Sequence, residues 1–177
     1  MITFRQLGET DLELLHGWLN QPHVSEWWGG PQALQKVRSD YLEPAPTDRT
    51  TYYVVDCDDA EIGLIQRYPW SAERPNYIQA IGALAGEVGI DYLIGVPALV
   101  GVGLGPRMIG TFLAERVFDD PQVTAVRTAV AVQNQRSWRC LGRLGFERVD
   151  EKVLPDEKHP EYVLVLPRAS WESRAKR

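Results

Sequence analysis

The sequence has few cysteines, few basic residues and no long apolar run. Only two cysteines, Cys57 and Cys140, occur among the 177 residues, too few for the disulfide framework of a small secreted protein. Glycine and charged residues interrupt every apolar stretch before it reaches the roughly 20 residues of a transmembrane helix. Residues 1–5 open a strand-like pattern and do not resemble a secretory signal. We therefore expect a cytoplasmic protein with reduced thiols and no membrane partner.

Positive charge is scarce as well. Nineteen Lys and Arg residues stand against 24 Asp and Glu residues, which gives a net charge of −5. Surfaces that bind nucleic acid are basic, so we expect no nucleic-acid partner, and the acidic chain slightly favours a cationic ligand. The histidines at 16, 23 and 159 have no metal-ligand spacing with one another or with the cysteines, so no metal site is predicted.

The length and the order of apolar patterns predict one domain, residues 1–177, with a mixed α/β fold. Apolar spacing predicts strands at residues 2–7, 51–55, 61–68, 87–94, 124–132, 146–153 and 162–166, and helices at 12–20, 31–41, 106–118 and 134–144. Residues 69–85 are expected to be irregular. Strands near both ends, with helices at fixed places between them, favour one sheet with helices on both faces.

The most specific signal is a glycine-rich turn at residues 100–105, which reads V-G-V-G-L-G. It lies between a predicted strand and a predicted helix. Glycine lets the backbone approach a phosphate closely, and the first N–H groups of the helix favour an anion. About thirty residues later, a helix that begins at Asn134 ends at Gly145, a typical helix C-terminus. The turn is therefore predicted to bind an anionic group.

Together these features resemble the GCN5-related N-acetyltransferases (GNAT). Within that superfamily, H-V-S-E-W-W-G-G at residues 23–30, G-I-D-Y-L-I at 89–94 and Arg139-Cys140 resemble the aminoglycoside 6′-N-acetyltransferases, and the resemblance spans about residues 7–149. It implies a GNAT fold, in which a central mixed, mostly antiparallel sheet splays apart at the acetyl-CoA site and helices cover both faces.

The resemblance also implies that acetyl-CoA is the acetyl donor and that no metal takes part. The pyrophosphate is expected on the glycine turn, and the pantetheine arm along the edge of the strand at 92–94. Asn134 is expected to contact the pantetheine, with Ser137 or Arg139 near the nucleotide. The residues implied in acetyl-CoA binding are Tyr92, Leu93, Ile94, Gly101, Val102, Gly103, Leu104, Gly105, Asn134, Ser137 and Arg139.

Four positions depart from the pattern that the resemblance implies. Val100 stands where the family prefers Gln or Arg, and Val102 where a basic residue is frequent, so phosphate binding would depend mostly on the backbone. Leu141 stands where many relatives have a Tyr that acts as general acid near the sulfur. Ala129 stands where the aminoglycoside enzymes often have an Asp that contacts an amine.

Acetyl transfer to an amine requires a neutral nitrogen, so a base or a water chain must remove a proton. It also requires N–H donors for the developing oxyanion, which a strand edge such as Leu93 can supply. Asp91 interrupts an apolar run and is the predicted base or amine anchor. Its alternative is a carboxylate paired with Arg or one on a solvated face. Glu87, on the same strand face, is a second candidate, and its alternative is a solvated strand end.

Acidic and aromatic residues from the loops are predicted to line the acceptor site. Trp27 and Trp28 can form a wall for a sugar ring or a cation, although one of the two is expected to pack in the core or in a lid. The predicted acceptor-binding residues are Glu26, Trp27, Trp28, Tyr41, Trp70, Glu73 and Asp91.

The function implied is transfer of acetyl from acetyl-CoA to a primary amine of an aminoglycoside antibiotic. The 6′-amine is favoured, and Ala129 leaves a 2′-amine open. One alternative is acylation of lysine, N6-hydroxylysine or a small polyamine; the siderophore-type lysine N-acyltransferases usually have His where this chain has Asp91. Another is a non-catalytic acyl-CoA-binding module, which Val100 and Leu141 favour. Because dimers occur in the family, both a monomer and a homodimer are left open.

Overall fold

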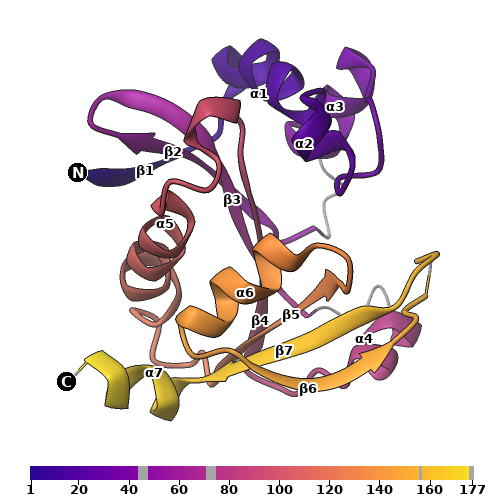
Figure 1. The fold of residues 1–177 in the computed structure, drawn as a ribbon, viewed down its shortest axis with the longest axis vertical. Helices are drawn as coiled ribbons and strands as arrows, with labels where there is room; N and C mark the ends of the chain where they lie inside the picture. The colour runs from indigo at the N-terminus through magenta and orange to yellow at the C-terminus, as the bar shows by residue number, and fades with distance from the viewer. Residues whose placement is uncertain (44–47, 71–74, 156, 176–177) are drawn as a thin grey trace. The chain divides into compact units, whose positions relative to one another are not determined.

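The structure is a computed structural model that describes residues 1–43, 48–70, 75–155 and 157–175. Its described strands form one seven-stranded sheet in the order β1-β2-β3-β4-β5-β7-β6. The strands are β1 (Ile2–Gln6), β2 (Thr51–Cys57), β3 (Ala60–Pro69), β4 (Glu87–Ile94), β5 (Ala125–Ala131), β6 (Glu147–Lys152) and β7 (Glu161–Pro167). The α-helices are α1 (Leu12–Leu19), α2 (Pro22–Ser25), α3 (Leu34–Tyr41), α4 (Pro75–Ile81), α5 (Leu104–Phe112), α6 (Gln135–Arg143) and α7 (Arg168–Ala175) (Figure 1).

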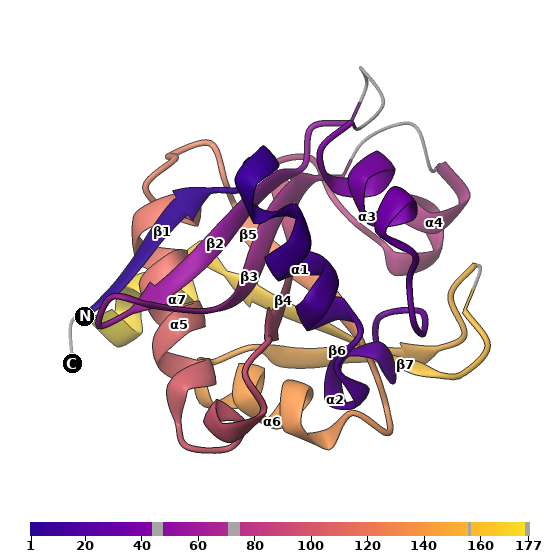
Figure 2. The same cartoon turned by 90° about the horizontal axis from the view of Figure 1, so that it is seen from above.

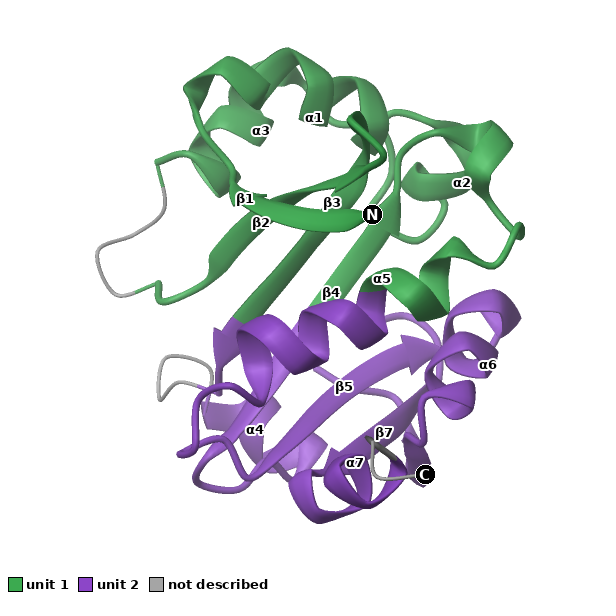
Figure 3. Cartoon of the chain, turned by 90° about the vertical axis from the view of Figure 1, so that its left-hand side faces the viewer, with its two compact units in different colours: residues 1–67, 91–108 green, residues 68–90, 109–177 purple. Residues whose placement is uncertain are grey.

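The predicted mixed, mostly antiparallel sheet is confirmed. Strands β1 and β2, β2 and β3, β5 and β7, and β6 and β7 pair antiparallel, whereas β4 and β5 pair parallel. The described chain divides into two compact units, residues 1–67 with 91–108 and residues 68–90 with 109–177 (Figure 3). Strands β3 and β4 and helix α5 each run from one unit into the other. The expectation of a single domain stays a prediction.

In the first unit, α1 lies over β2 and β3 (Figure 2) and packs on them together with α3. Apolar residues at helical spacing on α1 meet alternate residues of the strands. The core side chains are Leu12, Leu15, Trp18, Leu19, Val24, Val37, Val54, Leu64 and Leu93. Burial of each of the larger side chains contributes roughly 1.5–3 kcal/mol. Because Val24 belongs to α2 and Leu93 to β4, this core also holds α2 against the end of β4.

In the second unit, helices lie on both faces of β7. Val163 packs in a core cluster with Ile81 of α4, whereas the ring of the adjacent Tyr162 packs edge-on against Trp138 of α6, with the ring centroids 5.7 Å apart. Successive side chains of a strand point to opposite faces. Helices α4 and α6 therefore cover opposite faces of this part of the sheet, as expected (Figure 1).

Two predicted segments were wrong in detail. Residues 69–85, expected to be irregular, include helix α4, which begins at Pro75, where a proline is tolerated because the first turn of a helix leaves its N–H groups unpaired. The helix expected at residues 106–118 begins at Leu104 and continues after Phe112 as a π-helical turn, Leu113–Val117. The glycine turn therefore leads directly into α5.

Candidate active site

The pairing of β4 changes along the strand. Residues 87–88 form a parallel ladder with residues 125–126 of β5, and within the described chain the ladder ends there although both strands continue. The hydroxyl of Thr128 instead donates to the carbonyl oxygen of Ile90 at 3.1 Å. The described ladder between β4 and β5 is therefore two residue pairs long, and the predicted splay at residues 92–94 stays a prediction.

The last residues of β4 lie in the first unit, against β3. The N–H of Gly95 donates to the carbonyl oxygen of Ile62 at 2.8 Å. A Cβ on Gly63 would lie 2.1 Å from the carbonyl oxygen of Leu93, so only glycine permits this approach of β3 to β4. The side chain of Leu93 is buried in the core, and its carbonyl oxygen faces Gly63 of β3. Tyr92 and Ile94 are half-buried.

The glycine turn has a backbone that other residues rarely adopt. Gly101 and Gly103 have φ angles of 84° and 90°, in the left-handed region that favours glycine. Both are exposed, and no described atom lies within 4 Å of the position that a Cβ on either glycine would occupy. Leu104 begins α5 and is buried, while Val102 is exposed. The turn therefore presents backbone with open space beside the first turn of a nine-residue helix, which fits an anionic group.

Three predicted acetyl-CoA residues lie on α6, in the second unit. Asn134 is the N-cap of this helix, and its Oδ1 accepts a hydrogen bond of 3.2 Å from the N–H of Ser137. Arg139 is exposed, with its guanidinium carbon 5.2 Å from the centroid of the Trp138 ring. Leu141 is fully buried.

Asp91 is held by a side chain of the neighbouring strand. The amide Nε2 of Gln66 donates to Asp91 Oδ2 at 2.8 Å. Gln66 is opposite Tyr52 in the register of β3 and β2, and the Tyr52 ring lies 5.0 Å from that of Tyr41, between centroids. The carboxylate of β4 is therefore bound by Gln66 of β3, and the register neighbour of Gln66, Tyr52 of β2, packs against Tyr41 of α3.

The segment that follows α2 contacts the Tyr41–Tyr52 pair through one tryptophan. The indole N–H of Trp28 donates to the hydroxyl oxygen of Tyr41 at 2.8 Å, and Trp28 packs against the core of the first unit. Trp27 is 39% exposed and Glu26 is also exposed. The expectation that one of the two tryptophans packs is confirmed for Trp28. Of the predicted acceptor residues, the structure thus links Trp28 with Tyr41.

Burial and negative charge keep both phenol groups protonated. Burial raises the pKa of the Tyr41 hydroxyl well above its usual range, and the charge of Asp91 adds to that effect, whereas the hydrogen bond from Trp28 opposes it. Burial likewise raises the pKa of Tyr52 to about 12, with a further contribution from the charge of Asp48. At neutral pH both groups are therefore hydroxyl donors.

Glu87 has a different environment from Asp91. It is 7% exposed, so the alternative of a solvated strand end was wrong. Arg127 donates to both carboxylate oxygens, at 2.6 Å from Nε and 3.1 Å from Nη2, and the N–H of Leu84 donates to one of them at 2.9 Å. Both carboxylate oxygens of Glu87 are therefore already hydrogen-bonded. Its predicted role toward an amine stays a prediction.

Trp70 lies in an aromatic group of the second unit. Its ring packs edge-on against Tyr68, with centroids 5.3 Å apart, and stacks on Tyr77 at 6.0 Å. The Trp70 indole N–H is buried without a partner among the described residues. Glu73, the other acceptor residue predicted in this region, lies outside the described residues.

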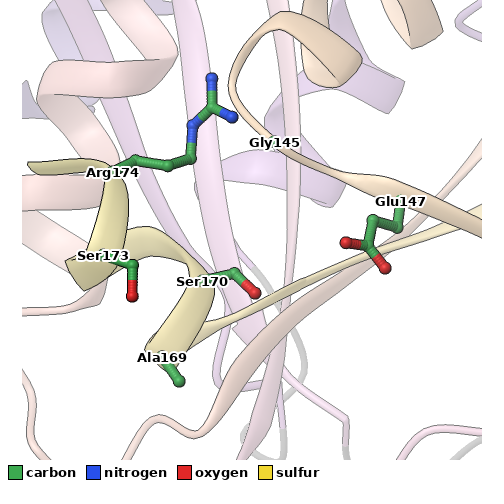
Figure 4. Close-up of a pocket in the computed structure, with 6 residues that line it drawn as sticks. All are labelled: Gly145, Glu147, Ala169, Ser170, Ser173 and Arg174. Carbon is green, nitrogen blue, oxygen red and sulfur yellow. The ribbon is translucent and has the colours of Figure 1, made fainter. Parts of the chain in front are cut away.

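An open pocket of the second unit is lined by other residues. Its lining consists of Gly145, Glu147, Ala169, Ser170, Ser173 and Arg174 (Figure 4). Arg174 donates to the carbonyl oxygen of Arg143 at 2.8 Å and so caps the end of α6. None of the predicted site residues lines this pocket, and the described residues include no group of three His, Cys, Asp or Glu that could hold a metal ion. We therefore place the candidate site elsewhere, along β4 and the glycine turn.

Sequence reasoning missed Gln66, Tyr52 and Arg127. Gln66 follows the apolar run at residues 62–65 of β3. A polar side chain directly after four buried residues was a signal in the sequence that could have marked it as a site residue. The pairing of Arg127 with Glu87 joins residues 40 positions apart, which no local pattern indicates.

A model of the acetyltransferase (GNAT) domain family matches residues 8–154. The chain belongs to the GNAT family of acetyltransferases. It is 32% identical to the aminoglycoside N(6′)-acetyltransferase type 1 of Klebsiella pneumoniae over 182 residues, which cover 97% of this chain and 85% of that protein. It is 34% identical to a kanamycin resistance protein of Rhizobium radiobacter over 109 residues, or 62% of this chain and 91% of that protein.

Solved structures agree with this assignment. The aminoglycoside acetyltransferase AAC(6′)-Ib in complex with coenzyme A and kanamycin matches with a TM-score of 0.88 and 31% identity, over the whole of both chains. Spermidine N-acetyltransferase from Vibrio cholerae, in complex with CoA and spermine, matches with a TM-score of 0.76 at 18% identity, over 97% of this chain and 98% of that chain. The second likeness shows the fold alone. This GNAT chain is therefore an acyltransferase, and no described helix is long and apolar enough to cross a membrane.

Proposed function

We propose that this acetyltransferase transfers the acetyl group of acetyl-CoA to the 6′-amine of an aminoglycoside. The observation that carries the proposal is the Asp91 carboxylate. It is half-buried on β4, accepts a hydrogen bond from Gln66, and contributes to the raised pKa of Tyr41. A carboxylate in such a setting suits a cationic amine. Relatives that cover nearly the whole chain are aminoglycoside N(6′)-acetyltransferases.

Acetyl-CoA fits the backbone of the first unit. In the proposed complex, the pyrophosphate lies on the N–H groups of residues 101–105, where two left-handed glycines leave open space beside the start of α5. The pantetheine arm lies along residues 92–94. Asn134 uses its side-chain oxygen as a helix cap, so its amide N–H₂ is the group proposed to reach the pantetheine. Ser137 and Arg139 are proposed to lie near the nucleotide.

The reaction proposed is direct attack within a ternary complex. The ammonium group of the acceptor gives a proton to Asp91 or to a water held by it, and the neutral nitrogen attacks the thioester carbonyl carbon. The oxyanion is proposed to accept a hydrogen bond from a backbone N–H on the edge of β4 that faces the donor. Alternation along the strand turns the backbone of Leu93, the residue predicted for this role, toward β3. The C–S bond then breaks, the nitrogen gives its second proton to water, and that water passes a proton to the CoA thiolate. Leu141 cannot donate this proton, because it is buried and carries no hydroxyl.

Acceptor recognition is assigned to the acidic and aromatic side chains of the first unit. Asp91 attracts the amine, the Tyr41 hydroxyl donates to a sugar oxygen, and the exposed Trp27 and Glu26 lie on the adjoining segment. Trp70 and Glu73 stay predicted acceptor-binding residues, whereas the carboxylate of Glu87, which is paired with Arg127, is not proposed to act on the amine. The enzyme is proposed to work in the cytoplasm, without nucleic acid or a metal, as a monomer or a homodimer.

The test is release of CoA thiol with a panel of amines, namely kanamycin, kasugamycin, lysine, N6-hydroxylysine and spermidine. The proposal predicts fast turnover with kanamycin and little with the others. Turnover with kasugamycin alone would move the reaction to a 2′-amine, and turnover with the lysine derivatives or spermidine alone would contradict the aminoglycoside assignment. Binding of CoA without turnover on any amine would support a non-catalytic acyl-CoA-binding module.

A further inference from the structure

His23 lies in α2, and its side chain reaches the end of β4. The Nε2–H of its imidazole donates to the main-chain carbonyl oxygen of Ile94 at 2.9 Å, in a partly buried bond that spans 71 positions of the chain. Both residues belong to the first unit. Ile94 is the last residue of β4, on the segment proposed to hold the pantetheine arm.

The carbonyl that His23 binds faces away from β3. The next residue, Gly95, directs its N–H to Ile62 of β3 at 2.8 Å. Because the backbone groups of successive residues along a strand point to opposite edges, the Ile94 carbonyl points to the edge of β4 that β3 does not use. His23 therefore occupies a position on the edge where the donor is proposed to bind.

The same short helix is tied to β4 a second time and then leads to the acceptor cluster. Val24, the neighbour of His23, packs in one core cluster with Leu93, the neighbour of Ile94. The N–H of Trp28 donates to the carbonyl oxygen of Val24 at 3.0 Å. The Trp28 indole in turn donates to Tyr41. A continuous set of contacts thus runs from the end of β4, through α2, to the phenol beside Asp91.

We infer that His23 is a positioning residue that fixes the end of β4 against α2, and thereby sets the thioester of the donor at the correct distance from the amine of the acceptor. This inference rests on the proposed function, because that function supplies both ligands. Loss of the imidazole leaves a partly buried carbonyl without its donor and frees the strand end on its open edge. Small displacements of reacting groups lower rates strongly.

The experiment compares His23→Ala and His23→Gln with a matched control, His16→Ala. His16 also donates from Nε2 to a main-chain carbonyl oxygen, that of Gln32, at 3.0 Å, in a partly buried bond of the same unit. That carbonyl also accepts from Asn20 Nδ2 at 3.0 Å and does not belong to β4. Calorimetry gives the dissociation constant of CoA without any acceptor, and steady-state kinetics give kcat and the KM of each substrate.

His23→Ala is expected to raise the dissociation constant of CoA and the KM of acetyl-CoA about tenfold, the size of one lost hydrogen bond. It is expected to lower kcat about tenfold, with the acceptor KM within about twofold of wild type. His23→Gln, whose amide N–H can reach the same oxygen, should recover most of both losses. His16→Ala should keep the wild-type constants. If the alanine variant fails to fold, His23→Asn, which is too short to reach, is compared with His23→Gln.

Wild-type CoA affinity and kcat in a folded His23→Ala variant would overturn the inference, and so would equal losses in His16→Ala. Failure of the proposed function gives a different result. In that case the wild-type protein binds CoA in the calorimeter but acetylates no aminoglycoside, and the effect of His23 on CoA affinity is still measured.

Discussion

Two carboxylates four residues apart on β4 differ in burial and in their hydrogen-bond partners. Asp91 is half-buried and accepts a neutral amide hydrogen bond from Gln66, whereas Glu87 is buried and matched by a guanidinium at 2.6 Å. A carboxylate already neutralised by Arg has little attraction left for a substrate ammonium. The pairing with Arg127 therefore disfavours Glu87 as the residue that handles the amine.

The first prediction concerns Asp91. Asp91→Asn keeps the size of the side chain and removes its charge and basicity, so kcat should fall on the order of 100-fold or more. The control is Asp119→Asn, at an exposed position of the second unit, which should behave as wild type. Kinetics over a range of pH provide the check, and near-normal rates of Asp91→Asn throughout would exclude the role as base or anchor.

A second residue-scale prediction concerns stability in acid. Arg5 binds Asp11 through two hydrogen bonds, of 2.7 and 2.9 Å, and holds the pKa of Asp11 below its ordinary value. A carboxyl with a lowered folded pKa stabilises the protein above its unfolded pKa of about 3.9, and the contribution is lost as the pH falls through the folded pKa. Because Arg5 is partly exposed, Asp11→Asn should cost about 1–2 kcal/mol at pH 7.

The measurement is the free energy of unfolding in urea from pH 7 down to acid. The difference between wild type and Asp11→Asn should shrink below about pH 4, where the carboxyl of the unfolded chain takes up its proton, and should vanish as the pH falls through the lowered folded pKa. A constant difference over the whole range would contradict the account of this ion pair.

At the element scale, the sequence predicted best where a local pattern decides the structure. Strand β4, the glycine turn and helix α6 with Gly145 at its end were all expected, because their signals lie within a few residues. Helix α4 was missed because its seven residues are too few to show a clear helical repeat of apolar side chains. The nearby Pro69 and Pro75 also suggested an irregular segment. Contacts between distant segments, such as Gln66 with Asp91, depend on strand register and were beyond local reasoning.

The glycine turn gives an element-scale prediction. Gly103→Val introduces a Cβ at a φ of 90°, where no described atom beyond its chain neighbours lies within 4 Å, so the new methyl groups would face the proposed pyrophosphate site. The KM of acetyl-CoA should rise by an order of magnitude or more, while the acceptor KM changes little. Gly82→Val is a matched control, because Gly82 has a φ of 69° and equally open surroundings. It shares the backbone strain of roughly 1–2 kcal/mol without approaching the proposed phosphate site.

Acetyl-CoA saturation that is unchanged in a folded Gly103→Val variant would refute the phosphate site. Equal KM increases in both variants would trace the effect to strain alone.

The buried pair in the second unit gives another prediction at this scale. Arg127 joins Glu87 of β4 and also donates to the carbonyl oxygen of Ile81, the last residue of α4, at 3.3 Å. Arg127→Met should destabilise the protein by about 3–5 kcal/mol, because it leaves a buried carboxylate unpaired. The double variant Glu87→Leu/Arg127→Met should be more stable than Arg127→Met alone. Chemical denaturation measures both, and equal losses in the single and double variants would contradict a mainly electrostatic cause.

At the scale of the whole molecule, the order of motifs along the chain predicted the family, and the match of residues 8–154 to the GNAT domain family confirmed it. The strand order β4-β5-β7-β6 could not be read from the sequence, since pairing partners are chosen by packing over long distances. The acidic net charge of −5 agrees with a cationic acceptor, but charge alone does not select an aminoglycoside over another polyamine. We propose that the side chains around Asp91 select an aminoglycoside over another polyamine.

The central claim is that acetyl is delivered to a 6′-amine, and its most direct test is the position of the new amide. The enzyme is incubated with acetyl-CoA and either an aminoglycoside that carries a 6′-amine or its 6′-hydroxyl analogue, and the products are assigned by NMR. The account predicts a single acetyl group on the 6′-nitrogen of the first compound and no turnover of the second. Acetylation at another nitrogen, or equal turnover of both compounds, would contradict it.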